Sequence, residues 1–250
     1  MKKNKVVGVI QARLSSSRLP KKVLLPLGNE NLVIDQVYNR LLLCRQIDEI
    51  YIATSNNDSD NELAEHCKQK KYNVFRGSLN DVLSRFSTIA KESKATHIVR
   101  ITGDCPLIEP SIIDACIIGC IANDYDLFGL KGNFPDGLDC QVFSSKSLIK
   151  ANDKAVKKSD KEHVGPFIED SKNGFKTGGI EIFLNHYNYR LTLDEQRDYD
   201  LLKTIFRSFD FNNYVSINDI LHFLDFNEKV RSINSKIVRN KGYLKSLKND

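Results

Sequence analysis

Arginines, lysines and small hydroxyl residues follow the first apolar stretch of the chain. After residues 6–10, the sequence reads Gln11-Ala12-Arg13-Leu14-Ser15-Ser16-Ser17-Arg18-Leu19-Pro20-Lys21-Lys22. Small residues let backbone N–H groups approach anionic oxygens, and guanidinium groups grip such oxygens two at a time. The segment has no Walker A pattern, but it predicts a loop that binds a polyphosphate. A basic loop that only faces solvent is the alternative.

Two carboxylates follow strand-like segments much further along the chain. Asp104 stands in Thr102-Gly103-Asp104-Cys105-Pro106, directly after residues 96–101, and Asp194 follows residues 189–193. Ligands of open parallel sheets bind outside the carboxyl ends of the strands, so Asp104 is expected beside the basic loop. Such carboxylates suit a Mg²⁺ ion that takes its other ligands from water and phosphate. A turn cap at Asp104 and a helix cap at Asp194 are the alternatives.

Other polar residues stand where they could line the same site. Arg76-Gly77-Ser78, followed by Asp81, Val82 and Arg85, ends a strand-like segment and could line a nucleotide pocket. Asp136 lies in a Pro-Asp-Gly turn and is expected to serve that turn, whereas Asp139 could face a polyhydroxylated substrate.

The sequence does not decide the roles of Glu162, His163 and Arg100. Glu162 and His163 are expected in the first turn of a helix, where they either bind substrate hydroxyls or cap the helix. No His or Cys spacing supports His163 as a metal ligand, and nothing makes it a general base. Arg100 stands among apolar neighbours in a strand, so it either pairs with a carboxylate or faces the site.

The expected elements alternate between strand and helix through the first half of the chain. This alternation predicts an α/β fold with parallel strands and helices on both faces, followed by shorter antiparallel pieces beyond Tyr125. Helix starts are expected at the pairs Ser78/Asp81 and Ser159/Glu162 and at Pro110. The expected strands span 5–10, 49–54, 73–76, 96–101, 138–143, 176–183 and 188–193, and the helices span 32–44, 60–70, 79–93, 112–121 and 195–209.

Composition narrows the class of protein. The 250 residues, 41% hydrophobic and 28% charged, suffice for one large domain with or without a small appendage. A net charge of +5 with scattered lysines favours a small anionic ligand over nucleic acid. No apolar run is long enough for a membrane span or a signal peptide. Six cysteines without a C-x-x-C pair predict reduced core thiols and a cytoplasmic protein.

Six motifs occur in order between residues 5 and 207, and together they carry a family resemblance. They are Ile10-Gln11-Ala12-Arg13 with Arg18-Leu19-Pro20-Lys21-Lys22, Phe75-Arg76-Gly77-Ser78 with Asp81-Val82-Leu83-Ser84-Arg85, Gly103-Asp104-Cys105-Pro106, Phe134-Pro135-Asp136-Gly137-Leu138-Asp139, Glu162-His163-Val164-Gly165-Pro166, and Arg190-Leu191-Thr192-Leu193-Asp194. In this order the chain resembles the SpsF-type members of the cytidylyltransferase family. Their relatives activate 3-deoxy-octulosonate and acylneuraminate sugars.

The resemblance implies a Rossmann-like nucleotide-diphospho-sugar transferase fold, with a mostly parallel sheet and an antiparallel extension on the substrate side. Residues 1–209 would form the nucleotidyltransferase domain and residues 210–250 a helical tail. CTP would be the donor, Mg²⁺ the cofactor and a homodimer the assembly. Thr102 stands where sugar-acid relatives often carry Gln, which leaves recognition of the base or the acceptor there open.

The expected reaction is attack of an acceptor oxygen on the α-phosphate of CTP, with release of pyrophosphate. The acceptor is expected to be a sugar acid for polysaccharide or glycan synthesis. Such chemistry needs charge neutralisation and alignment more than a dedicated nucleophile. Catalysis is assigned to Arg13, Arg18, Lys22 and Asp104, nucleotide binding to Gln11, Ala12, Ser17, Arg76, Gly77 and Thr102, acceptor binding to Asp136, Asp139, Glu162, His163 and Arg190, and metal binding to Asp104 and Asp194.

Two other functions compete with this interpretation. A GT-A-like glycosyltransferase would use Asp124-Tyr125-Asp126 or Asp198-Tyr199-Asp200 as its metal motif. A non-enzymatic RNA- or anion-binding module would use the basic loop and the lysine-rich segment 236–248. The favoured interpretation expects CTP and a small acceptor as partners, and neither nucleic acid nor a membrane.

Overall fold

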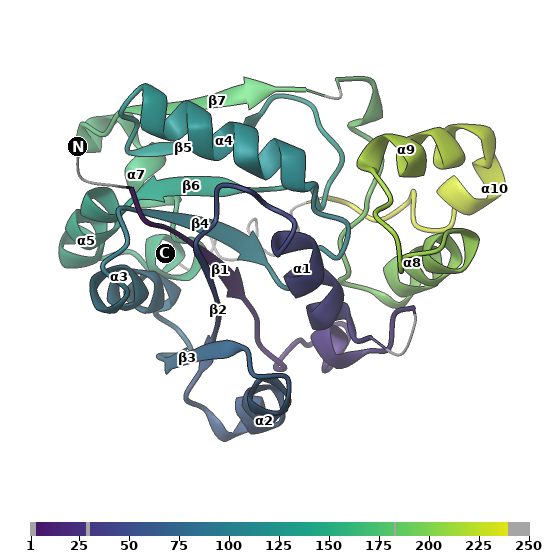
Figure 1. Ribbon diagram of the computed structural model, residues 1–250, viewed down its shortest axis with the longest axis horizontal. Helices are drawn as coiled ribbons and strands as arrows, with labels where there is room; N and C mark the ends of the chain where they lie inside the picture. The colour runs from purple at the N-terminus through teal and green to yellow at the C-terminus, as the bar shows by residue number, and fades with distance from the viewer. Residues whose placement is uncertain (1–3, 29–30, 183, 240–250) are drawn as a thin grey trace.

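The computed structural model describes residues 4–28, 31–182 and 184–239. Over these residues the chain forms one seven-stranded sheet with the order β3-β2-β1-β4-β6-β5-β7 (Figure 1). Only β6 runs against its neighbours, β4 and β5, and every other strand pair is parallel. The strands are β1 (Val6–Gln11), β2 (Glu49–Ser55), β3 (Asn73–Gly77), β4 (His97–Thr102), β5 (Leu127–Lys131), β6 (Gln141–Ser144) and β7 (Thr177–Glu181).

Helices connect the strands and follow them. The helices are α1 (Val33–Leu41), α2 (Asn61–Gln69), α3 (Val82–Glu92), α4 (Pro110–Ala122), α5 (Ser145–Lys154), α6 (Lys158–His163), α7 (Pro166–Glu169), α8 (Gln196–Ser208), α9 (Ile217–Phe226) and α10 (Glu228–Arg231). The 3₁₀ helices are η1 (Lys22–Leu24), η2 (Asp58–Asp60), η3 (Ser171–Asn173) and η4 (Leu184–His186).

Both faces of the sheet are buried, as the alternation of elements predicts. Successive side chains of a strand point to opposite faces, so β1 contributes to two cores. Val6 and Ile10 belong to a core that includes residues of α1, α4, α8 and α9. Val7 and Val9 belong to a second core, with residues of α3, α5 and α7. The predicted α/β fold, mostly parallel with helices on both faces, is confirmed.

The second half of the sheet differs from the expected antiparallel pieces. Strand β5 was not among the expected strands, and β7 pairs parallel with it because the chain passes through α5, α6 and α7 before returning. The expected strand over 188–193 is wrong. Only one bridge forms there, between Asp136 and Arg190, because Gly137 follows at a φ of 101° and turns the chain out of the extended conformation.

Two helix starts in the structure also differ from the predicted ones. Asp81 caps α3 by accepting a hydrogen bond from the Ser84 backbone N–H, whereas the Ser78 hydroxyl accepts only from the Asp81 N–H. Ser159 lies inside α6, which begins at Lys158. Pro110 does open α4.

The expected tail after residue 209 shares its core with the rest of the chain. Apolar residues of α9, Ile217 and Ile220 among them, pack in the same cluster as α8, and α8 to α10 lie together at one end of the molecule (Figure 1). Buried Glu109, the N-cap of α4, joins this segment to α1, because it accepts from the Ile217 N–H at 3.0 Å and pairs with buried Arg40 at 3.3 Å. The lysine-rich segment 236–248 lies outside the described residues from 240 onward.

Removing the Glu109 carboxylate tests this junction. We expect Glu109→Ala to lower the free energy of unfolding by about 3–5 kcal/mol, because the Arg40 guanidinium would stay buried without a counter-charge. Glu62→Ala, which breaks only the exposed pair with Lys21, is the control and should cost no more than about 1 kcal/mol. Urea unfolding measures both, and equal small losses would contradict the assignment.

Candidate functional site

The basic loop begins at the carboxyl end of β1 and is held by backbone and buried carboxylate contacts. The Ala12 N–H donates to the Ala53 carbonyl at 3.1 Å. Asp60, fully buried in η2, accepts from the Leu14 N–H at 2.7 Å and from the Ser55 N–H at 3.2 Å. This aspartate was not among the expected site residues. It fixes the loop that carries the cations although it does not line either cavity described below.

Backbone hydrogen bonds tie the loop to the segments that carry the two aspartates. The Gly103 N–H donates to the Gln11 carbonyl at 2.8 Å. A Cβ at residue 103 would lie 2.9 Å from the Ala12 Cβ, so only glycine permits this approach. The Leu193 N–H donates to the Asp104 carbonyl at 2.8 Å. These bonds therefore place Asp104 and Asp194 beside the loop.

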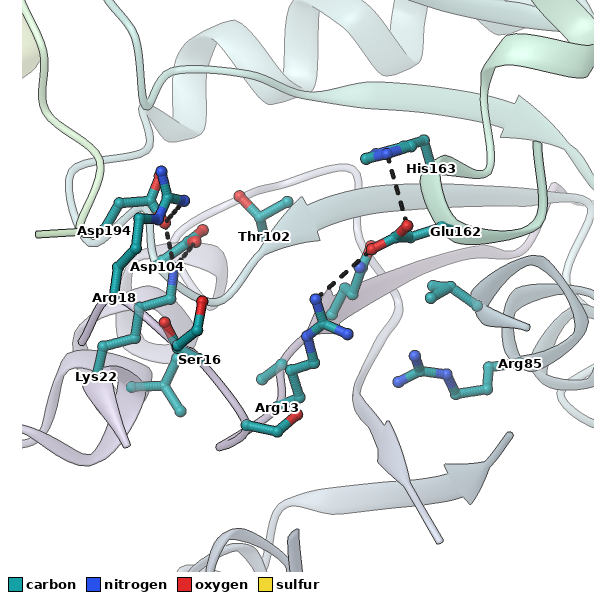
Figure 2. Close-up of a pocket in the computed structure, with 16 residues that line it drawn as sticks. Arg13, Ser16, Arg18, Lys22, Arg85, Thr102, Asp104, Glu162, His163 and Asp194 are labelled. Carbon is teal, nitrogen blue, oxygen red and sulfur yellow. Dashed lines mark hydrogen bonds and ion pairs between the residues drawn. The ribbon is translucent and has the colours of Figure 1, made fainter. Parts of the chain in front are cut away.

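Lys22 lies between the two carboxylates. Its Nζ is 2.5 Å from Asp104 Oδ2 and 2.6 Å from Asp194 Oδ1, and Arg18 Nη2 is 2.9 Å from the same Asp194 oxygen (Figure 2). Burial by itself lowers the pKa of Lys22, but attraction to Asp104 and Asp194 outweighs it and raises this pKa above 10.5. Lys22 therefore stays charged at neutral pH.

Asp194 belongs to this cluster and does not cap the helix that follows it. Glu195 is the N-cap of α8. Burial favours the neutral form of Asp194, but Lys22, Arg18 and Arg190 outweigh this effect and hold its pKa below the usual value. The carboxylate is therefore available as an anion in the cavity.

Arg190 forms an ion pair with Asp194 and fixes the position of its carboxylate. Its side chain is 6% exposed, and its guanidinium contacts Asp194 at 3.1 Å, Asp136 at 2.5 Å and Asp198 at 2.9 Å. Asp198 also accepts from the Asp194 N–H at 2.9 Å. The three carboxylates together accept hydrogen bonds from all three nitrogens of the guanidinium. Arg190 therefore acts on the site mainly by fixing Asp194.

A cavity of about 750 Å³ opens over the loop. Two groups face each other across it: the cluster around Lys22, and a second group in which Arg13 lies 3.6 Å from Glu162 and Glu162 lies 4.0 Å from His163 (Figure 2). The lining residues are Gln11, Ala12, Arg13, Ser15, Ser16, Ser17, Arg18, Lys22, Val23, Val82, Arg85, Thr102, Asp104, Glu162, His163 and Asp194. Residues that lie far apart in the sequence thus meet around one space large enough for a nucleotide.

A second cavity of about 460 Å³ adjoins the first, and the two share Arg18, Thr102, Asp104, His163 and Asp194. The expected acceptor-binding residues Asp136, Asp139 and Arg190 line the second cavity and not the first. Its other lining residues are Arg100, Cys105, Leu130, Phe134, Cys140, Gln141, Pro166, Glu169 and Thr192.

Two of the expected nucleotide-binding residues lie outside both cavities. Arg76 lines neither cavity, since it donates to the Ser55 and Asn57 carbonyls and to Asn61. Gly77 lines neither cavity and makes room for Arg85, because a Cβ there would lie 2.7 Å from Arg85 Cγ.

Glu162 and His163 reach the cavity from a different part of their helix than expected. The sequence interpretation put them in a first helical turn, but they are the last two residues of α6. Val164, with a φ of 69°, ends that helix and is fully buried.

Neither Asp-x-Asp motif of the glycosyltransferase alternative forms a metal site. Asp198 is buried under Arg190, and Asp200 lies at the surface near Lys203. Asp126 accepts from the Lys176 N–H. Both motifs lie outside the two cavities.

The donor set around Lys22 fits a hard divalent cation. In the described part of the chain no three His, Cys, Asp or Glu side chains gather as a metal cage. Asp104 and Asp194 nevertheless converge on one point, the Lys22 ammonium, and present carboxylate oxygens to the cavity. Mg²⁺ commonly takes one or two protein carboxylates and completes its shell with water and phosphate oxygens. Two carboxylates beside a basic loop match that requirement.

The six cysteines are buried and free, as the spacing predicts. Burial raises the pKa of Cys44, Cys67 and Cys120 to about 12, so these thiols stay protonated. Among the described residues, no helix has the length and apolar character that a membrane crossing needs.

Comparison with known proteins assigns the chain to the nucleotidyltransferases. The sequence model of the family described as cytidylyltransferase matches residues 7–234, and the chain belongs to that family.

The chain is also similar to individual proteins. The chain is 39% identical to the protein MJ1063 of Methanocaldococcus jannaschii over 96% of this chain and 98% of the relative. It is 30% identical to the spore coat polysaccharide biosynthesis protein SpsF of Bacillus subtilis, over 90% and 95% of the two chains. A 3-deoxy-manno-octulosonate cytidylyltransferase of Solibacter usitatus matches about half of each chain, 53% and 52%, at 33% identity.

A solved structure also matches the whole fold. The structure of a cytidylyltransferase from Leptospira borgpetersenii superposes with a TM-score of 0.87 at 29% identity. The match covers 95% of this chain and all of that one. The predicted resemblance to SpsF-type cytidylyltransferases is thereby confirmed.

The ionisation of Asp136 gives a pH-dependent prediction. Burial and the nearby charge of Asp139 raise its pKa from 3.8 to about 6 despite Arg190. The folded state thus binds this proton more tightly than the unfolded state, so the contribution of Asp136 to stability falls as pH rises from about 4 to about 6 and is constant above. We expect the unfolding free energy of wild type minus that of Asp136→Asn to fall by about 2 kcal/mol across this range.

Urea unfolding between pH 4.5 and 7.5 measures this difference. Exposed Asp153 supplies the control, because Asp153→Asn should differ from wild type by a constant amount. A difference for Asp136→Asn that does not change with pH would refute the assigned pKa.

Proposed function

We propose that the protein transfers CMP from CTP to a sugar acid and releases pyrophosphate. The observation that carries this proposal is the junction of the two cavities at Arg18, Asp104 and Asp194. A nucleotide in the larger cavity and an acceptor in the smaller would meet at that junction. In-line attack on the α-phosphate needs this arrangement, with the acceptor oxygen and the leaving pyrophosphate on opposite sides of phosphorus.

The cations of the loop stabilise the phosphates in this proposal. Arg18 and Lys22 lie at the junction and offset charge that builds on the α-phosphate and on pyrophosphate. Arg13 holds the triphosphate from the far side of the larger cavity. The backbone of residues 11–17, with its small side chains, surrounds the remaining phosphate oxygens. Thr102 lies at the boundary between the nucleotide and the acceptor.

Asp104 and Asp194 would hold Mg²⁺. Such an ion would supply positive charge that offsets the charge of the phosphates. Lys22 is then free to donate to phosphate oxygens in place of the carboxylates, since its raised pKa keeps it protonated.

The smaller cavity would hold the acceptor. Asp139 and His163 supply hydrogen-bonding groups for hydroxyls there, while Asp136 and Arg190 keep Asp194 in place. Glu162 lines the larger cavity and would reach an acceptor hydroxyl only from that side. A sugar-acid acceptor for polysaccharide synthesis is supported by the names of two relatives, SpsF and the octulosonate cytidylyltransferase. A cytoplasmic homodimer with neither nucleic acid nor membrane as partner completes the proposal.

A screen of four nucleoside triphosphates tests the donor. Each is incubated with Mg²⁺ and a panel of sugar acids and phosphorylated acceptors, and pyrophosphate is followed. We expect release from CTP only, with a sugar acid present. Pyrophosphate from another triphosphate, or none from CTP with UDP- or GDP-sugars accepted as donors instead, would refute the proposal.

Asp104→Asn tests the catalytic centre. We expect turnover to fall by about 10²–10³-fold or more, because one of the two metal-binding carboxylates becomes neutral. Asp153→Asn, an exposed change of the same chemistry, should keep wild-type turnover. Urea unfolding checks that both variants fold, and wild-type rates of pyrophosphate release from folded Asp104→Asn would remove Asp104 from the mechanism.

A further inference from the structure

Arg100 is a cation of the smaller cavity that the proposed reaction has not used. It stands on β4 between Val9 of β1 and Gln141 of β6. Its Nε donates to Gln11 Oε1 at 3.0 Å and its Nη1 donates to Gln141 Oε1 at 2.8 Å. Two amide oxygens on neighbouring strands therefore fix the plane of the guanidinium.

Glu169 fixes one of these amides in turn. Gln141 Nε2 donates to Glu169 Oε1 at 3.1 Å, so the amide oxygen of Gln141 is the atom turned toward Arg100. The Gln141 side chain also packs against Gly165, where a Cβ would lie 2.8 Å from Nε2. The side chain that holds Arg100 is thus itself held on two sides.

Both partners of Arg100 are neutral. Within the described ranges, no Asp or Glu oxygen lies within 4.0 Å of its guanidinium, whereas Arg18 and Arg190 in the same cavity each contact carboxylates. A guanidinium has five N–H groups, and Arg100 uses two of its nitrogens for the glutamines. The remaining N–H groups are available to the cavity that the residue lines.

This environment favours an anionic ligand. Burial disfavours the charged form of Arg100 and lowers its pKa, and this effect exceeds the attraction of Asp139, Asp104 and Glu169, none of which pairs with the guanidinium. An anion bound to the open N–H groups would remove that penalty. Five carboxylates line the same cavity, at residues 104, 136, 139, 169 and 194, and they oppose a dianionic phosphate more than a monoanion. One guanidinium fork also matches one carboxylate.

We propose that Arg100 binds the carboxylate of the acceptor and so selects acids over their neutral counterparts. Gln11 and Gln141 are positioning residues that aim the guanidinium. Thr102 and Asp104 follow Arg100 along the chain toward the junction of the cavities, so an acceptor anchored at Arg100 extends toward the reacting end. The inference rests on the proposed function, because it assigns the smaller cavity to the acceptor.

The test compares each acid with its own methyl ester. Binding of 3-deoxy-manno-octulosonate and of N-acetylneuraminate, and of the methyl ester of each, is measured by calorimetry with Mg²⁺ and α,β-methylene-CTP. We expect wild type to bind at least one acid about 10–100-fold more tightly than its ester, the range for a charge-assisted hydrogen-bonded pair. In Arg100→Gln and Arg100→Met this ratio should fall to about 1, and Arg100→Lys should keep part of it.

The ratio is its own control, since any damage to folding or nucleotide affinity affects acid and ester alike. Arg207→Met, an exposed change of the same kind, should leave the ratio at the wild-type value. The inference is overturned by a wild-type ratio near 1, by no binding of either acid, by a ratio that persists in Arg100→Met, or by glucose 1-phosphate binding that depends on Arg100. Binding of CTP to wild type is measured separately. Failure there rejects the proposed function, whereas CTP binding together with any overturning result rejects only the role of Arg100.

Discussion

The site depends on the ammonium group of Lys22, which lies between the carboxylates of Asp104 and Asp194. These residues are 82 and 172 positions from Lys22 in the sequence, so one cation joins three distant parts of the chain. Without it the two carboxylates would face each other in a poorly solvated space and repel. With it, both carboxylates lie together beside the basic loop. The proposed function requires Lys22 to exchange these carboxylate oxygens for phosphate oxygens when a nucleotide binds.

The sheet explains why these residues meet. In the parallel pair β1 and β4, Gln11 lies opposite Thr102, so the loops after both strands leave at the same edge. The reversed strand β6 then places Gln141 beside Arg100, at the border of the smaller cavity. A purely parallel sheet would place a crossover element there instead. The single antiparallel strand therefore creates the wall on which the second cavity is built.

Sequence reasoning recovered what periodicity and motif order determine. The alternation of strands and helices up to residue 122, and the convergence of Lys22 and Asp104, follow from local pattern and from the parallel topology. Asp194 was expected there from the order of the motifs. The expected strand around Arg190 failed because its apolar alternation reflects burial beside the Asp136 turn, where pairing ends after one bridge. Asp60 was missed because a buried aspartate that binds backbone N–H groups leaves no periodic signal.

The arginines show why residue type alone could not settle their roles. Arg76 closes a loop on backbone carbonyls, and Arg190 is surrounded by three carboxylates. Arg85, 1% exposed, donates to the Ala53 carbonyl, and burial lowers its pKa to about 10. Arg190 has a carboxylate on each of its guanidinium nitrogens and serves the fold. Within the described part of the chain, Arg85 and Arg100 have only neutral hydrogen-bond acceptors and line the cavities, whereas Arg76, also with neutral acceptors, lines neither. Both the partners of an arginine and its position relative to the cavities, which only the folded chain reveals, are therefore needed to infer its role.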